Sequence, residues 1–200
     1  MYSLLIKNGL VIDGSGTPGE TADIAIDKDR IAAVGPALAG EALRVIDARG
    51  LAVAPGFIDL HSHSDRTIIA TPTADSKLRQ GVTTEVVGNC GIGPFPLTPE
   101  HRSELESYFG TLEGEGGGDV DWTDFAGFAA AVQKARPTLN IAPLVGHGSL
   151  RIAAMGSADR LPAAAELANM EELLAENLRQ GAWGMSTGLI YPPGSYAKTE

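Results

Sequence analysis

Hydrophobic and polar residues alternate in short runs over the first 52 residues, and polar turns separate these runs. Alternation with a period of two is typical of β-strands that bury one face. Asn8-Gly9 predicts a two-residue hairpin, and the polar segment 27–30 predicts a second turn. The expected strands are Ser3–Lys7, Leu10–Asp13, Asp23–Ile26, Ile31–Val34 and Arg44–Ala48. We therefore expect residues 1–52 to form a small β-sandwich, or part of one.

From residue 53 onward, apolar runs alternate with amphipathic segments. The expected strands are Val53–Leu60, Val82–Asn89 and Asn140–Gly146, and Trp183–Tyr191 is expected to form a fourth strand with its loop. Helices are expected at 74–80, 98–109, 124–136 and 162–180, the last with an apolar stripe of Leu167, Met170, Leu174 and Leu178. The glycine-rich segment 114–119 is expected to be a flexible surface loop.

This alternation of strands and helices predicts an α/β fold with a parallel sheet, either a (β/α)8 barrel or a doubly wound sheet. A barrel has eight strands and typically about 250 residues. Residues 53–200 would then supply about four βα units, the first half of such a barrel.

Gly14–Gly19 matches the G-x-G-x-x-G pattern of dinucleotide-binding loops. A dinucleotide site also needs a helix directly after the glycines, because the helix N-terminus holds the pyrophosphate. Ala22–Ile26 follows instead and has the pattern of a strand. We interpret the glycines as a turn.

Charge and cysteine content exclude some classes of function. The chain has 25 acidic and 15 basic side chains and a net charge of −10, which argues against a nucleic-acid partner. No segment approaches the roughly 20 apolar residues of a membrane helix, and the N-terminus lacks the features of a signal peptide. A single cysteine cannot form an internal disulfide. We therefore expect a cytoplasmic protein without a membrane partner.

The candidate chemistry begins with His61 and His63, which follow the apolar run 53–60. Residues two apart on a strand point to the same side, so both imidazoles can hold one ion. Cys90, the only cysteine, follows the next apolar run. Buried histidines that only hydrogen-bond a carbonyl are common, and a lone cysteine is usually an inert core residue. Two imidazoles and a thiolate nevertheless suit zinc, so the sequence predicts the beginning of a metallohydrolase site.

Three further residues are candidates for substrate binding. His147 is expected at the end of the third strand, as a ligand, an oxyanion donor, a supporting residue or a structural turn histidine. Arg151 follows the third strand, and it is expected either to bind an anionic group of the substrate or to form a surface salt bridge. Tyr191 lies in the loop after the fourth strand, where it could donate to a developing oxyanion or belong to a rigid Pro-Pro loop.

Four segments together resemble the amidohydrolase superfamily and, within it, the D-aminoacylase (N-acyl-D-amino-acid deacylase) family. They are Pro55–Asp65, Val86–Gly91, Val145–Arg151 and Ser186–Gly194. Many superfamily members bridge two metals with a modified lysine on the fourth strand, but Trp183–Ile190 contains no lysine. The D-aminoacylase group uses the cysteine of the second strand in that role.

The resemblance implies a β-sandwich and a (β/α)8 barrel with one or two zinc ions at the strand ends. His61 and His63 would be ligands of a weaker site and Cys90 a ligand shared with a tighter one. The expected reaction is hydrolysis of an N-acyl-D-amino acid, a small-molecule substrate, to a carboxylate and a D-amino acid. The family takes two more histidine ligands and a catalytic aspartate from later strands, which would lie beyond residue 200.

We therefore expect this polypeptide to be part of a longer enzyme, or to need a complementary chain for the missing C-terminal half. Two alternatives remain open at this point. One is a hydantoinase-like hydrolase of cyclic amides or dipeptides from the same superfamily. The other is a non-catalytic fragment that acts, if at all, as a binding or assembly piece.

Overall fold

The computed structural model describes residues 1–113 and 120–198. The chain divides into two compact units, Met1–Gly56 and Phe57–Glu200. The expected division was at residues 52 and 53, a few positions earlier. The expected flexible loop at 114–119 lies outside the described residues.

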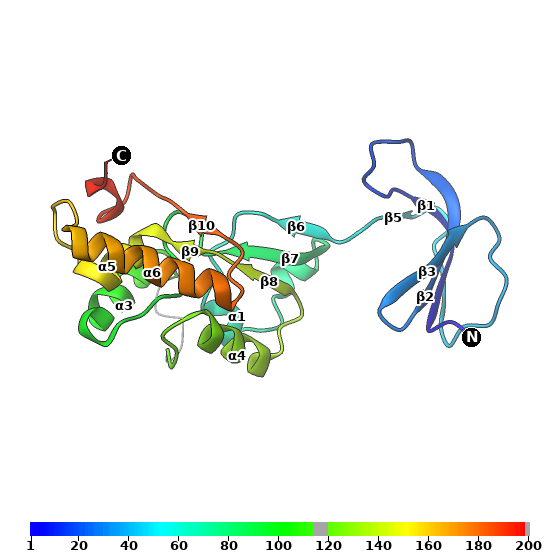
Figure 1. Cartoon of the computed structure of the whole chain (residues 1–200). Coiled ribbons are helices and arrows are strands. Elements are labelled where there is room, and N and C mark those ends of the chain that lie inside the picture. Colours follow the sequence, from blue (N-terminus) through cyan, green and yellow to red (C-terminus); the bar gives the residue numbers. More distant parts are fainter. Residues whose placement is uncertain (114–119, 199–200) are drawn as a thin grey trace. The chain divides into compact units, whose positions relative to one another are not determined.

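The first unit is a single five-stranded sheet (Figure 1). Its strands are β1 (Leu4–Val11), β2 (Glu20–Asp27), β3 (Arg30–Gly35), β4 (Val45–Asp47) and β5 (Ala52–Val53). β2 pairs antiparallel with both β1 and β3, whereas β4 and β5 run parallel to β1. The predicted turn at 27–30 is confirmed as the β2–β3 connection. The glycines of 14–19 lie between β1 and β2 and no helix follows them, so their interpretation as a turn is confirmed as well.

The predicted hairpin at Asn8-Gly9 is wrong, because β1 runs through both residues. Asn8 has a left-handed φ of 62°, and the register with β2 shifts between Ile6 and Gly9. Asp23 Oδ1 accepts a hydrogen bond from Asn8 N at 2.8 Å. The residues that favour a tight turn here form a β-bulge instead.

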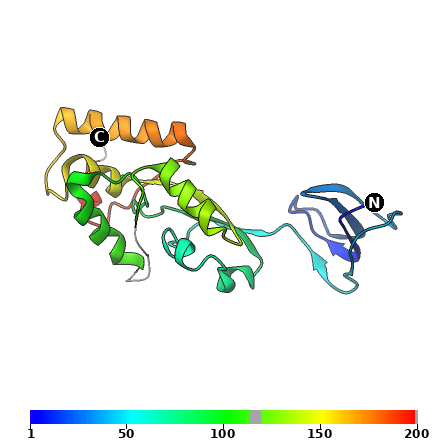
Figure 2. The same cartoon turned by 90° about the horizontal axis from the view of Figure 1, so that it is seen from below.

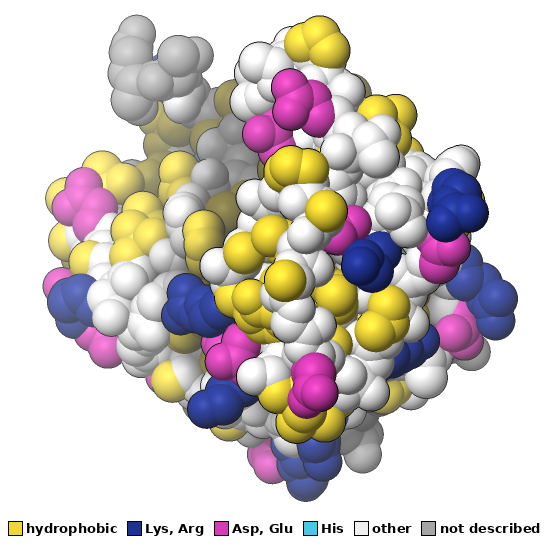
Figure 3. All heavy atoms as spheres, turned by 90° about the vertical axis from the view of Figure 1, so that its right-hand side faces the viewer, with side chains coloured by type: hydrophobic (Ala, Val, Ile, Leu, Met, Phe, Trp, Pro, Cys, Tyr) yellow, Lys and Arg dark blue, Asp and Glu magenta, His cyan; other side chains and the backbone are white. Residues whose placement is uncertain are grey.

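One surface of this sheet is concave and apolar. The cavity has a volume of about 730 Å³, and its lining includes Ile12, Ile24, Ile31, Val34 and Val53. Figure 3 looks onto this unit and shows hydrophobic side chains at its surface among charged ones. Apolar side chains that stay exposed on a sheet are typical of a face that packs against another layer.

The second unit contains two short parallel sheets. β6 (Phe57–Asp59), β7 (Val82–Val87) and β8 (Asn140–Pro143) pair in that order, and β9 (Val145–Gly146) pairs with β10 (Met185–Ser186). All of these pairings are parallel. The C-terminal ends of β6 and β7 therefore lie at the same edge, where the histidine and cysteine motifs follow.

Two strand predictions in this unit are wrong in extent. Residues 53–60 do not form one buried strand, because Pro55 and Gly56 separate β5 from β6, and Ile58 is 60% exposed. In Trp183–Tyr191, expected to be a strand with its loop, the strand is only the two residues of β10, and Trp183 is 75% exposed. In both segments the pattern of apolar residues predicts burial, but none of the described residues packs over these side chains, which stay exposed.

The helices of the second unit are α1 (Thr67–Ala70), α2 (Asp75–Leu78), α3 (Arg102–Glu113), α4 (Phe125–Ala135), α5 (His147–Met155) and α6 (Ala164–Gln180), with short 3-10 turns at Pro99–His101 and Gly194–Tyr196. The expected helices at 74–80, 98–109, 124–136 and 162–180 are present with shifted ends. Helix α5 is not predicted by the sequence. Because it begins at His147, this residue is the first of a helix and not the last of a strand.

The core of this unit lies among α3, α4, α5, α6 and the segment 92–97 (Figures 1 and 2). Phe95 and Phe128 lie with their ring centroids 5.6 Å apart at its centre. Of the predicted stripe on α6, Met170 and Leu174 pack on this core, whereas Leu167 and Leu178 are exposed. No helix of the described residues is long and apolar enough to span a bilayer.

Asp124 begins α4 and joins it to α6. Its Oδ1 accepts a hydrogen bond from Gly127 N at 2.9 Å, and its Oδ2 accepts one from Gln180 Nε2 at 3.0 Å. Asp124→Ala should lower the free energy of unfolding by about 1–2 kcal/mol, because it removes the N-cap acceptor. Urea denaturation measures this change. Asp121→Ala, at an exposed position nearby, is the control, and equal midpoints for the two variants would contradict the prediction.

Candidate metal centre

Two histidines follow β6 at its C-terminal end. His61 is exposed and His63 is half-buried, and their ring centroids lie 5.4 Å apart. Asp59 Oδ1 accepts a hydrogen bond from His61 N at 3.2 Å, and Val86 O accepts one from Ser62 N at 3.2 Å. These bonds fix the loop beside the end of β7, so both imidazoles lie next to the cysteine turn.

Cys90 lies in the turn after β7 with a left-handed φ of 57°. A non-glycine residue in this conformation costs about 1–3 kcal/mol and persists only where its surroundings fix it. Gly91 N donates to Ser186 Oγ at 3.0 Å, and Gly148 N donates to Gly91 O at 2.8 Å. The turn is therefore held by β10 and by the first residues of α5. Backbone strain of this kind is typical of functional sites.

The ligand atoms of His61, His63 and Cys90 all lie within 4.8 Å of one another. His61 Nε2 and Cys90 Sγ are 3.2 Å apart. In a tetrahedral zinc site with bonds of about 2.1 Å to nitrogen and 2.3 Å to sulfur, two such atoms lie about 3.6 Å apart. The donor set therefore suits zinc, and the three side chains lie close enough together to converge on one ion. Burial, together with nearby His61, lowers the pKa of His63, which favours the neutral imidazole that binds metal.

His147 lies at the same edge as the cysteine turn, because the next residue, Gly148, is bonded to Gly91. Its Nδ1 is buried and has no hydrogen-bond partner among the described residues. Burial, with the charge of Arg151 as a second cause, lowers the pKa of His147. His147 therefore lies beside the cysteine turn as a largely buried imidazole with a ring nitrogen that no described residue uses.

Arg151 and Tyr191 occupy different environments. Arg151 is 1% exposed, and its guanidinium donates to the carbonyl oxygens of Ala158, at 3.2 Å, and Arg160. Arg151 therefore bonds main-chain carbonyls in the interior and does not form the surface salt bridge considered above. Tyr191 is exposed, and its N–H donates to Gly188 O at 3.2 Å. Tyr191 therefore lies at the surface, whereas Arg151 is buried and held by the turn that follows α5.

Comparison with known proteins identifies the family of this chain. The sequence profile described as "Amidohydrolase family" matches residues 44–197, which include all three clustered side chains. The chain belongs to the amidohydrolase family. The resemblance to the D-aminoacylases is confirmed by relatives of high identity from Alcaligenes xylosoxydans xylosoxydans. This amidohydrolase is 43% identical to an N-acyl-D-glutamate deacylase over 197 residues and 39% identical to a D-aminoacylase over 203 residues.

Solved structures show the same similarity. The crystal structure of D-aminoacylase matches with a TM-score of 0.87 at 39% identity, over 100% of this chain and 41% of that one. An N-acyl-D-glutamate deacylase from Bordetella bronchiseptica, complexed with zinc and a phosphonate inhibitor, matches with a TM-score of 0.83 at 40% identity, over 98% of this chain and 40% of that one. The mixed α/β fold of the family is confirmed.

The amidohydrolase chain is shorter than these relatives. The alignment with the N-acyl-D-glutamate deacylase covers 98% of this chain and 39% of that protein. The alignment with the D-aminoacylase covers 100% of this chain and 40% of that protein. This chain therefore spans about two fifths of the length of the curated relatives it matches.

Tyr108 is a residue near the site that the sequence does not single out. It lies on α3, and its hydroxyl is 3.5 Å from Gly91 O. Burial, followed by the charges of Cys90 and Tyr191, raises the pKa of Tyr108 to about 12. A protonated phenol next to the cysteine turn can donate hydrogen bonds at neutral pH. The sequence shows only a tyrosine in an amphipathic helix, and nothing in that pattern predicts that its hydroxyl lies beside the cysteine turn.

Proposed function

We propose that this chain is the N-terminal part of a zinc-dependent amidohydrolase that cleaves N-acyl-D-amino acids to a carboxylate and a free D-amino acid. The observation that carries the proposal is the cluster of His61, His63 and Cys90 at the ends of adjacent parallel strands. The named activities of the relatives and the zinc and phosphonate in a related structure support it.

We also propose that the second unit is the first half of a (β/α)8 barrel and that the first unit is one layer of a β-sandwich. The strand order β6-β7-β8 is parallel and sequential, as in a barrel. Apolar residues stay exposed along β6 and around β10, including Ile58, Leu60, Trp183 and Ile190. Later strands of the longer polypeptide, or of a complementary chain, would cover them.

The roles of the chain's own residues follow from their positions. His61, His63 and Cys90 would hold zinc, as one or two ions, and zinc would activate water and polarise the amide carbonyl.

Tyr191 would donate a hydrogen bond to the carbonyl oxygen, and His147 would contact the substrate beside it. Arg151 could bind the substrate only if its guanidinium gave up its hydrogen bonds to the carbonyl oxygens of Ala158 and Arg160. A general acid or base aspartate is expected beyond residue 200. A thiolate ligand requires reduced cysteine, which is consistent with a cytoplasmic location.

Metal removal and substrate choice test the proposal together. In the full-length polypeptide, a chelator should abolish hydrolysis of N-acetyl-D-amino acids and added zinc should restore it, because the ligands are soft and suit zinc. Free amine release measures the reaction, and the L-enantiomers are the matched control. Zinc-loaded protein that ignores the D-substrates would reject the proposal. Turnover of hydantoins alone would favour the cyclic-amide alternative, and absence of any turnover would favour the non-catalytic one.

A further inference from the structure

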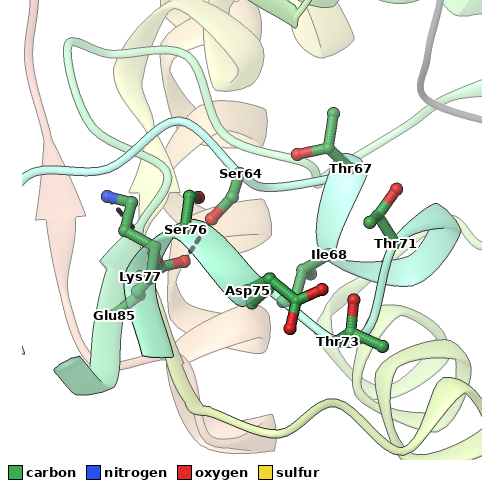
Figure 4. A pocket seen from close by; sticks show the side chains of 10 residues that line it. Ser64, Thr67, Ile68, Thr71, Thr73, Asp75, Ser76, Lys77 and Glu85 are labelled. Atoms are coloured by element: carbon green, nitrogen blue, oxygen red, sulfur yellow. Dashed lines mark hydrogen bonds and ion pairs between the residues drawn. The ribbon is translucent and has the colours of Figure 1, made fainter. Parts of the chain in front are cut away.

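A carboxylate is buried in the middle of β7, the strand that precedes the cysteine turn. Glu85 is 0% exposed and lies in a strand otherwise made of valine and threonine. Burying a charge costs several kcal/mol unless close partners compensate for it. Glu85 has two such partners: Lys77 Nζ lies 3.3 Å from Oε1, and Ser64 Oγ donates to Oε2. Figure 4 shows the three side chains converging from α2, β7 and the loop after β6.

Lys77 connects Glu85 to a second carboxylate on the neighbouring strand. Its Nζ also pairs with Asp59, and Asp59 is the register partner of Glu85 in the β6–β7 pairing. The bond to Asp59, followed by that to Glu85, raises the pKa of Lys77, and the bond to Lys77 lowers the pKa of Asp59. One ammonium group therefore lies between two carboxylates and stays charged at neutral pH.

The same network reaches the histidine loop at both ends. Asp59 Oδ1 accepts from His61 N, and Ser64 follows His63 directly. Ser62 Oγ and Ser64 Oγ are 3.2 Å apart. Because the single hydroxyl hydrogen of Ser64 is donated to Glu85, Ser62 must donate in this pair. The loop that carries both imidazoles is thus tied to Glu85 and Lys77 before and after the histidines.

We propose that Glu85 is a positioning residue of the metal centre: with Lys77, it fixes the loop from His61 to Ser64 so that both imidazoles face Cys90. This inference rests on the metal-binding role in the proposed function. Glu85 itself is not a ligand and acts through Ser64 and, by way of Lys77, through Asp59. An apolar side chain would fill position 85 without the cost of a buried charge, but it could not orient the loop through hydrogen bonds.

Cobalt substitution tests the proposal, because the thiolate-to-cobalt absorption band reports directly on the ligand geometry. The full-length polypeptide is loaded with Co²⁺, and its spectrum and cobalt dissociation constant are compared with those of Ser64→Ala and Glu85→Gln. Both variants should shift or weaken the band and raise the dissociation constant about tenfold or more. Ser76→Ala is the matched control, since Ser76 lines the same pocket but makes no side-chain hydrogen bond to Glu85 among the described residues. Its spectrum should equal that of the parent.

A double substitution shows whether Ser64 acts through Glu85. Adding Ser64→Ala to Glu85→Gln should change the dissociation constant much less than Ser64→Ala does alone. Additive effects would overturn the proposal, and so would an unchanged spectrum and affinity in Ser64→Ala. If Glu85→Gln fails to fold, Ser64→Ala decides alone, because it leaves the pair of Glu85 and Lys77 intact. A parent protein without a band that depends on Cys90 would instead refute the proposed metal site itself.

Discussion

Cys90→Ala in the full-length polypeptide should remove most of the bound zinc and lower amide hydrolysis by at least roughly 100-fold. The sulfur of Cys90 is the donor that distinguishes this cluster from a pair of histidines alone. Its Sγ lies 3.2 Å from His61 Nε2, so its loss leaves two imidazoles without their third ligand on this part of the chain. Elemental analysis of zinc per chain, together with hydrolysis of N-acetyl-D-amino acids, measures both effects.

Cys90→Ser and a histidine outside the cluster sharpen this experiment. A serine hydroxyl is a poor substitute for a thiolate, so Cys90→Ser should lose most of its zinc as well. His101→Ala is the control, because His101 Nδ1 bonds Glu104 at 2.9 Å and lies outside the cluster. Its zinc content should match that of the parent. Parental zinc and activity in Cys90→Ala would remove this residue from the site.

The cluster is accessible to sequence reasoning because strand geometry alone brings it together. His61 and His63 follow β6, Cys90 follows β7, and the two strands are neighbours in a parallel sheet. Each motif directly follows an apolar run, so the position of each along the chain also gives its position in the fold. Whether these side chains bind zinc stays a prediction from chemistry and from the relatives.

Segment boundaries are less accessible, because identical local signals have more than one structural outcome. Asn8-Gly9 suits a tight hairpin, but β1 pairs with β2 on both sides of these residues, so they form a bulge within the strand. The apolar run 53–60 resembles one strand, but Pro55-Gly56 divides it between two units. Tertiary pairing decides both cases, and the residues involved do not encode it locally.

Contacts that do not follow from the order of the strands could not be predicted. Tyr108, on α3, contacts Gly91 of the cysteine turn from 17 positions further along the chain. Lys77, on α2, compensates the charge of Glu85. The one available signal was a charged residue inside the apolar strand β7, since buried carboxylates require a partner. That signal predicts that a partner exists but does not identify it.

Gly188→Ala should be strongly destabilising and should also disturb the metal centre. A β-carbon at position 188 would lie 1.8 Å from Cys90 O and 2.5 Å from Cys90 C, which are main-chain atoms that cannot rotate away. The loop after β10 and the cysteine turn therefore pack backbone against backbone, and one methyl group must separate them. Overpacking typically costs 1–3 kcal/mol, and the rigidity of this contact predicts about 3 kcal/mol or more.

Gly110→Ala provides the matched control for this substitution. Gly110 lies in α3, where a β-carbon would have nothing within 4 Å, so alanine should stabilise the helix by up to about 1 kcal/mol. Urea denaturation gives both stabilities, and zinc content shows whether the Cys90 turn has moved. Because Cys90 already has a strained φ that its neighbours hold in place, displacing Gly188 should release zinc even where the protein stays folded. A folded Gly188→Ala protein with parental stability and full zinc would show that the cysteine turn does not depend on this contact.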